Sequence, residues 1–146
     1  MRVHIGSDHA GFALKERMRA HLVSTGHDVT DVGADSEASV DYPVFAKAVA
    51  VAVSRGEADA GVLVCGTGIG MAIAANKVSG VRAVQASDPE FARLARRHND
   101  ANVVTLAGRF IDAEAAAAIV DAFLGESFEG GRHAGRVEQI SALERP

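Results

Sequence analysis

The chain has 146 residues, of which 48% are hydrophobic and 23% charged, and these near-average values exclude wholesale disorder and predict one domain, residues 1–146. The formal net charge of −4 and the aromatic content of 5% argue against a nucleic-acid partner, and no apolar run is long enough to predict a membrane span. The single cysteine excludes an internal disulfide framework and favours a reducing cytoplasm.

Five short runs rich in Val, Ile and Leu, each bounded by Gly, Ser or Asp, predict β-strands. These runs are Arg2–Ser7, Asp28–Val32, Ala60–Val64, Val81–Ala86 and Ala101–Leu106. Apolar residues on both faces of the runs predict a sheet that is covered on both sides. Because the runs alternate with stretches of helical period, we expect parallel strands with right-handed crossovers, that is, an α/β fold built as a three-layer α/β/α sandwich.

The segments between the runs predict helices by the spacing of their apolar residues. The predicted apolar faces are Leu14, Met18 and Leu22 in the first helix, Phe91, Leu94, Ala95 and His98 in the fourth, and Ala116, Ile119, Val120 and Phe123 in the fifth. Lys15 is expected on a charged face of the first helix. Tyr42-Pro43 predicts the start of the second helix, because proline fits a first turn. Residues 132–143 predict a last helix.

Polar residues that follow the strands are the candidates for a functional site, because open parallel sheets bind ligands beyond the carboxyl ends of their strands. Asp8 and His9 follow the first strand. Their alternative roles are a helix cap for Asp8 and an ordinary surface residue for His9.

The third strand is followed by Cys65-Gly66-Thr67-Gly68-Ile69-Gly70, in which alternating glycines expose backbone N–H groups at a helix start. Such a nest binds an anion, and a thiol placed there carries a larger thiolate fraction. The alternatives are a buried cysteine that acts as a small hydrophobe and a tight turn that permits close packing. The loop does not complete the Gly-x-Gly-x-x-Gly fingerprint, so a nicotinamide cofactor is not predicted.

Basic residues near the later elements favour a phosphorylated ligand. Arg109 follows the fifth strand, and Arg132 and Arg136 share one helix face at a spacing of four residues. Salt bridges are the alternative, with Glu129 or Glu138 as partners of the last two arginines.

His98 and Asn99 end the fourth helix, and their alternative roles are an apolar-face histidine and a helix C-cap. No His-x-x-x-His or Cys-x-x-Cys spacing predicts a metal site, and no Gly-x-Ser-x-Gly elbow predicts a serine triad. The whole set therefore suits proton transfer on a small phosphorylated molecule.

Six separate blocks, in this order and spacing, resemble the type B ribose-5-phosphate isomerase family, which includes galactose-6-phosphate and allose-6-phosphate isomerases. The blocks are residues 7–12, 41–43, 65–70, 74–77, 97–102 and 130–133 with Arg136. The resemblance implies a Rossmann-like sheet of five parallel strands in the order 2-1-3-5-4. It also implies a homodimer or dimer of dimers with shared active sites, and no cofactor.

The same resemblance implies interconversion of ribose 5-phosphate and ribulose 5-phosphate, with Cys65 as the base that moves a proton between C1 and C2 and His98 in ring opening. The implied substrate-binding residues are Asp8, His9, Gly66, Thr67, Gly68, Ile69, Gly70, Asn99, Arg109, Arg132 and Arg136. Members without the cysteine use a glutamate four residues later, and Ile69 stands at that position here, so the chain is of the cysteine type.

Two other functions stay open at this point. One is the same isomerisation on an erythrulose phosphate, allose 6-phosphate or galactose 6-phosphate. The other is a non-catalytic sensor of a phosphorylated ligand on the same fold. The joint presence of Cys65 and His98 favours the enzyme, because a sensor requires neither.

Overall fold

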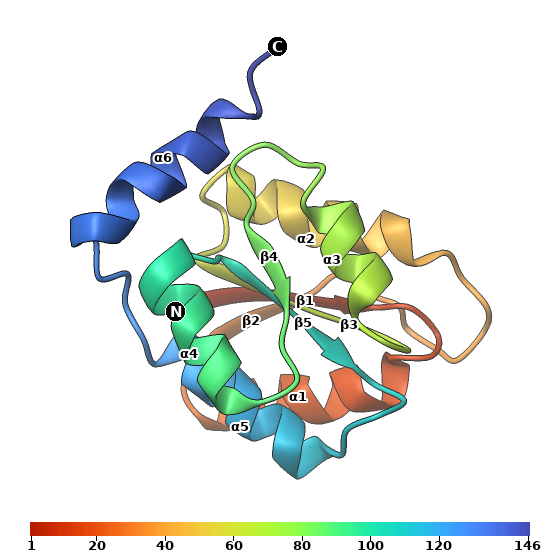
Figure 1. Cartoon of the computed structure of the whole chain (residues 1–146). Coiled ribbons are helices and arrows are strands. Elements are labelled where there is room, and N and C mark those ends of the chain that lie inside the picture. The colour runs from red at the N-terminus through yellow and green to blue at the C-terminus, as the bar shows by residue number, and fades with distance from the viewer.

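A five-stranded parallel sheet with helices on both faces forms the centre of the computed structural model, which describes residues 1–146 (Figure 1). The strands are β1 (Arg2–Ser7), β2 (Asp28–Asp31), β3 (Ala60–Cys65), β4 (Ala83–Gln85) and β5 (Val103–Ala107). Their order is β2-β1-β3-β5-β4 and all four pairings are parallel, which confirms the predicted fold class and strand order.

The helices are α1 (Phe12–Ser24), α2 (Tyr42–Ser54), α3 (Ile69–Ala75), α4 (Pro89–Asn99), α5 (Ala113–Leu124) and α6 (Ala134–Ala142). One core joins the sheet to α1, α4 and α5, and a second core joins the opposite face to α2 and α3. The predicted helix over residues 132–143 is divided into a 3-10 turn at Gly131–His133 and the shorter α6. None of the helices combines the length and the apolar character that a bilayer crossing requires.

The edge position of β4 explains why it is shorter than the predicted run Val81–Ala86. β4 pairs only with β5, through three residue pairs, so the flanking residues have no second strand to extend the ladder. Val81 and Ala86 are nevertheless buried, 4% and 1% exposed, which is why the hydrophobic pattern extends beyond the strand.

Two helix faces differ from the sequence prediction. Lys15 is fully buried instead of solvent-facing, and its Nζ lies 2.7 Å from Asp31 Oδ2 and 3.1 Å from Glu16 Oε1. The long aliphatic stem packs inside while the ammonium is neutralised at the end of β2. In α4 the buried residues are Ala92 and Ala95, whereas Phe91 is 65% exposed, because small side chains let this helix approach its neighbours closely.

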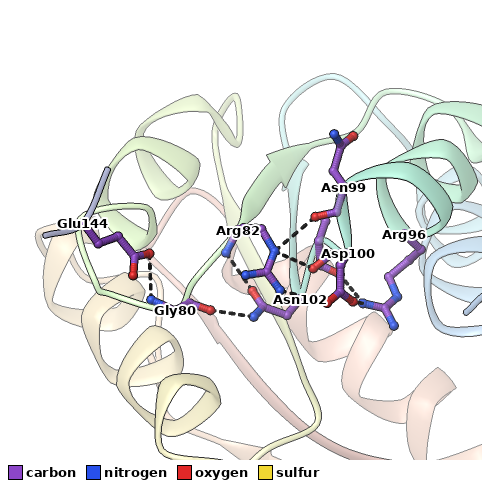
Figure 2. A network of polar contacts seen from close by, with 8 residues as sticks. Gly80, Arg82, Arg96, Asn99, Asp100, Asn102 and Glu144 are labelled. Carbon is purple, nitrogen blue, oxygen red and sulfur yellow. Dashed lines mark hydrogen bonds and ion pairs between the residues drawn. The ribbon is translucent and has the colours of Figure 1, made fainter. Parts of the chain in front are cut away.

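A polar network ties the end of α4 to β4 and to the chain terminus (Figure 2). Arg82 Nε donates to the carbonyl oxygens of Asn99 (3.1 Å) and Asp100 (2.8 Å), and Asp100 adopts a left-handed conformation at φ 48°. The N–H of Gly80 donates to the Glu144 carboxylate at 2.8 Å, which holds the residues after α6 against the body. The network therefore fixes the backbone that follows His98.

The Lys15–Asp31 pair generates a stability prediction. Asp31→Ala leaves the buried ammonium with only Glu16 and also removes the 2.9 Å bond from the Gly33 N–H, so we expect a loss of about 3 kcal/mol in the free energy of unfolding. Asp28→Ala, at the exposed start of the same strand, is the matched control and should cost less than about 0.5 kcal/mol. Urea unfolding measures both, and equal small losses would contradict the assignment.

Candidate functional site

The carboxyl edge of β1, β3 and β5 forms the wall of a cavity of about 540 Å³, which we call the Cys65 pocket. The parallel register places Ser7 beside Val64 and Cys65 beside Ala107, so the segments that follow the three strands emerge together. The lining residues are Asp8, His9, Ala10, Tyr42, Cys65, Gly66, Thr67, Ile69, Gly70, Ile73 and Arg109. The topology thus brings together most of the strand-end residues that the sequence analysis selected.

Cys65, the last residue of β3, lies at the border between the second core and the pocket. Its side chain is 4% exposed, and its Sγ accepts a hydrogen bond from the Gly68 N–H at 3.2 Å. The Arg109 N–H donates to the Gly66 carbonyl at 3.0 Å, and a Cβ on Gly66 would lie 3.1 Å from Arg109 Nη1. The thiol and a guanidinium therefore occupy the same small cavity.

The glycine loop supplies hydrogen-bond donors without acceptors. The amide N–H groups of Gly66, Thr67 and Gly70 donate to no group of the chain. Gly68 requires glycine because its φ is +76°, and a Cβ on Gly70 would lie 2.6 Å from the Tyr42 ring. A loop with three available N–H groups beside a thiol can stabilise an oxygen that gains negative charge.

Asp8 and His9, which follow β1, form one wall of the Cys65 pocket. The Asp8 carboxylate accepts the Gly11 N–H at 2.9 Å, so the residue does cap the following turn while it lines the cavity. His9 Nδ1 lies 3.2 Å from the backbone of Val40. Gly68 is the one member of the predicted loop that does not line the cavity.

Tyr42 lines the pocket and was missed as a site residue, because the sequence analysis treated it only as a helix start. Its presence in one of the six conspicuous blocks was the available signal. The ring packs against Gly70, so the first residue of α2 and the glycine loop form one wall.

A second cluster of functional groups lies at the end of α4. The rings of His98 and His133 stack with centroids 4.2 Å apart and an interplanar angle of 13°. Glu129 Oε2 lies 3.9 Å from His98 Nε2 and 3.6 Å from His133 Nε2. Arg97 Nε donates to Glu129 Oε1 at 2.6 Å. We call this set the His98 cluster.

The three ligand-type atoms of His98, Glu129 and His133 lie within 4.8 Å of one another, a grouping that the sequence spacing did not indicate. The Glu129 carboxylate is already neutralised by Arg97, and this pairing lowers the pKa of Glu129 below its usual value. Burial lowers the pKa of His133, and the positive charges of His98 and Arg132 act in the same direction. The surroundings of this cluster therefore favour an incoming anion over a cation.

The Cys65 pocket and the His98 cluster lie at opposite ends of the strands. The pocket is at their carboxyl ends, and the cluster is at their amino ends. The crossover helix α4 runs antiparallel to the strands, so its last residues return to the edge where the strands begin. None of residues 97–99 or 129–136 lines the Cys65 pocket. Asn99 instead borders a larger groove of about 610 Å³ between α4, β4 and the end of α6. One chain therefore does not bring His98, Asn99, Arg132 and Arg136 to the thiol.

None of the three arginines predicted to bind the phosphorylated ligand has an acidic partner. No carboxylate oxygen lies within 4.0 Å of Arg109, Arg132 or Arg136, and Glu129 pairs with Arg97 instead. The alternative in which Glu129 or Glu138 neutralises the C-terminal arginines is therefore not formed. These guanidinium groups are available to a ligand.

Comparisons with known proteins agree along the whole chain. A family model described as ribose/galactose isomerase matches residues 3–140. Ribose-5-phosphate isomerase B of Escherichia coli (strain K12) is 51% identical over 144 residues, covering 99% of this chain and 97% of that protein. The crystal structure of a ribose 5-phosphate isomerase from Thermotoga maritima is 50% identical, with a TM-score of 0.95 and 97% of each chain covered. Ribose-5-phosphate isomerase B of Mycoplasma genitalium, solved with bound ribulose-5-phosphate, is 42% identical, with a TM-score of 0.94 and coverage of 99% and 96%.

The lowered pKa of His133 predicts a pH dependence of stability. Because the unfolded chain binds this proton more readily than the folded chain, the contribution is present above about pH 6.5 and is lost as pH falls through the lower folded pKa. His133→Phe keeps a ring that can stack on His98 but does not titrate. We expect its free energy of unfolding to fall less than that of the parent between pH 7 and pH 5 in urea titrations. Identical slopes would show that His133 is not buried in its neutral form.

Proposed function

The chain belongs to the ribose/galactose isomerase family, and from this premise we propose that it interconverts ribose 5-phosphate and ribulose 5-phosphate. The observation that supports this proposal most strongly is the Cys65 pocket, which combines a thiol, three available N–H donors and an unpaired arginine. The names of the relatives and the ribulose-5-phosphate bound in the Mycoplasma genitalium protein support this substrate.

We assign the proton transfer to Cys65. The thiolate removes the proton from C2 of the open-chain aldose, and the electron pair of that C–H bond forms the C1–C2 double bond while the carbonyl electrons move to O1. The resulting enediolate oxygens are held by the N–H groups of Gly66, Thr67 and Gly70, each worth about 3 kcal/mol by precedent. Cys65 then returns the proton to C1 while the hydroxyl proton of O2 passes to O1, so that the C2 oxygen becomes the ketose carbonyl and O1 a hydroxyl.

The other residues divide between ring opening and binding. We assign His98 to proton transfer at the furanose ring oxygen and the anomeric hydroxyl, because it is the more accessible of the two stacked rings, with its side chain 33% exposed against 8% for His133. Arg109, Arg132 and Arg136 hold the phosphate, whose binding energy positions the reacting carbons. Asp8, His9, Thr67, Ile69 and Asn99 contact the remaining sugar atoms.

Two copies of the chain complete each site in this proposal. Cys65 and His98 lie at opposite edges of one chain, so a two-fold dimer supplies His98, Asn99 and the C-terminal arginines of one copy to the Cys65 pocket of the other. The exposure of α6 supports such a contact, because this helix buries none of its own residues and Leu143 beyond it is 83% exposed. A dimer of dimers meets the same requirement. The reduced Cys65 suits an enzyme of the cytoplasm.

A direct test is turnover with solvent exchange. Purified protein in deuterium oxide should convert ribose 5-phosphate to ribulose 5-phosphate and incorporate deuterium, detected by mass spectrometry. A sensor would bind the sugar phosphate without exchange. Comparing kcat/KM for four-, five- and six-carbon sugar phosphates tests the alternative substrates, and a clear preference for a four- or six-carbon substrate would contradict the five-carbon assignment.

Removal of the proposed base should separate chemistry from binding. Cys65→Ala is expected to lower kcat by about 10³-fold or more, because it removes general-base catalysis, while ribulose 5-phosphate binding by calorimetry changes less than about twofold. Cys65→Ser, which keeps size but ionises far less readily, should be similarly inactive. Full activity of the alanine variant would remove Cys65 from the base role.

Mixing two inactive variants tests the shared site. If each site takes Cys65 from one copy and His98 from the other, a mixed dimer of Cys65→Ala and His98→Asn has one intact site and one doubly altered site. Random exchange makes half of the dimers mixed, so activity should recover to about one quarter of the parent value. Absence of recovery after demonstrated subunit exchange would place both residues in one chain's site.

A further inference from the structure

Two side chains behind the Cys65 pocket hold the glycine loop from outside. Thr105 on β5 is fully buried, and its Oγ1 donates to the Gly68 carbonyl at 2.6 Å. Gln85 on β4 donates from Nε2 to the Thr67 carbonyl at 3.3 Å. Neither residue lines the pocket, and neither belongs to the motifs that identified the site.

Each of these two bonds holds the carbonyl oxygen of a peptide group. The N–H on the opposite side of that group faces the reactive part of the pocket. In a trans peptide the C=O and the following N–H point in opposite directions. The peptide whose oxygen accepts from Gln85 carries the Gly68 N–H, which donates to Cys65 Sγ at 3.2 Å. The peptide whose oxygen accepts from Thr105 carries the Ile69 N–H, which donates to Thr67 Oγ1 at 3.2 Å.

Close packing leaves the loop little freedom at this point. A Cβ on Gly68 would lie 3.0 Å from the backbone carbon of Leu106 and 3.1 Å from Gln85 Cγ. Ser87 Oγ donates to Gln85 Oε1 at 3.3 Å, which turns the amide nitrogen toward the loop. The loop therefore rests directly on β5 and on the Gln85 side chain.

We propose that Thr105 and Gln85 are positioning residues for the isomerisation. Gln85 orients the Gly68 amide, which donates to the Cys65 sulfur, and Thr105 orients the Ile69 amide, which donates to the Thr67 hydroxyl. The assignment rests on the proposed function only in naming Cys65 as the base. Rotation of either peptide plane would remove one N–H donor from the side of the loop that faces Cys65 and Thr67. Neither bond involves Arg109, Arg132 or Arg136, so we expect substrate affinity to change little.

Thr105→Val removes the hydroxyl but keeps the shape of the side chain. We expect kcat to fall about three- to tenfold with KM changed less than twofold, and Thr105→Ser to restore kcat because it returns the donor. Thr25→Val is the matched control, since it removes a threonine bond to backbone carbonyls at the end of α1. It should leave kcat unchanged. A loss of stability in Thr105→Val with kcat intact would reduce Thr105 to a structural role and overturn the proposal.

Cysteine alkylation tests the same arrangement without any substrate, and the single cysteine makes the signal unambiguous. The iodoacetamide rate at pH 10 reports access to the ionised thiol, so the ratio of the rates at pH 7 and pH 10 reports the thiolate fraction. In Gln85→Leu we expect this ratio to fall about threefold or more, because the Gly68 N–H no longer stabilises the thiolate. Ser24→Ala, which loses a bond to a helix carbonyl, serves as the control.

The two experiments separate this proposal from the proposed function. An unchanged alkylation ratio in Gln85→Leu, or an unchanged kcat in Thr105→Val, would overturn the joint positioning role even if the parent enzyme isomerises ribose 5-phosphate. A reduced ratio in Gln85→Leu would support the positioning of the thiol even if the parent converted no ribose 5-phosphate.

Discussion

The register of the central ladder is the constraint on which the site depends. Ser7 pairs with Val64 and Cys65 with Ala107, so β1, β3 and β5 end at one edge within a residue of one another. Asp8, Gly66 and Arg109, which lie one or two residues beyond the ends of these strands, therefore line the same cavity. A shift of one residue in β3 would turn the Cys65 side chain to the opposite face of the sheet, away from the glycine loop.

The same parallel topology separates the functional side chains of one chain into two groups. Strands that all point one way require helices that return the other way, so residues at the end of α4 lie at the opposite edge from the residues that follow the strands. The stacked histidines and the unpaired Arg132 and Arg136 thus have the chemistry of half a site without a substrate cavity of their own. The Cys65 pocket has the complementary deficit, with the thiol proposed as the base and unpaired loop amides but only one arginine. The proposed association of two copies would supply what each half lacks.

The sequence predicted well which residues follow the strands, because the patterns that reveal those residues are local in the chain. Alternation of strand and helix, the glycine spacing after Cys65 and the proline at the start of the second helix are all determined by neighbouring residues. The failures share a different cause. Burial of Lys15 depends on Asp31 across a crossover, and the stacking of His133 on His98 joins segments 35 positions apart. The support of the loop by Thr105 and Gln85 was equally invisible, since both residues read as ordinary strand positions.

A crystal structure with a linear five-carbon sugar phosphate bound tests the central claim most directly. The account predicts that Cys65 Sγ lies within about 3.5 Å of C1 and C2, in the near-attack range. The C1 and C2 oxygens should face the glycine loop, with His98 and the C-terminal arginines of a second copy closing over the ligand. A ligand seated in the groove beside Asn99, with the sulfur out of reach of its carbons, would contradict it.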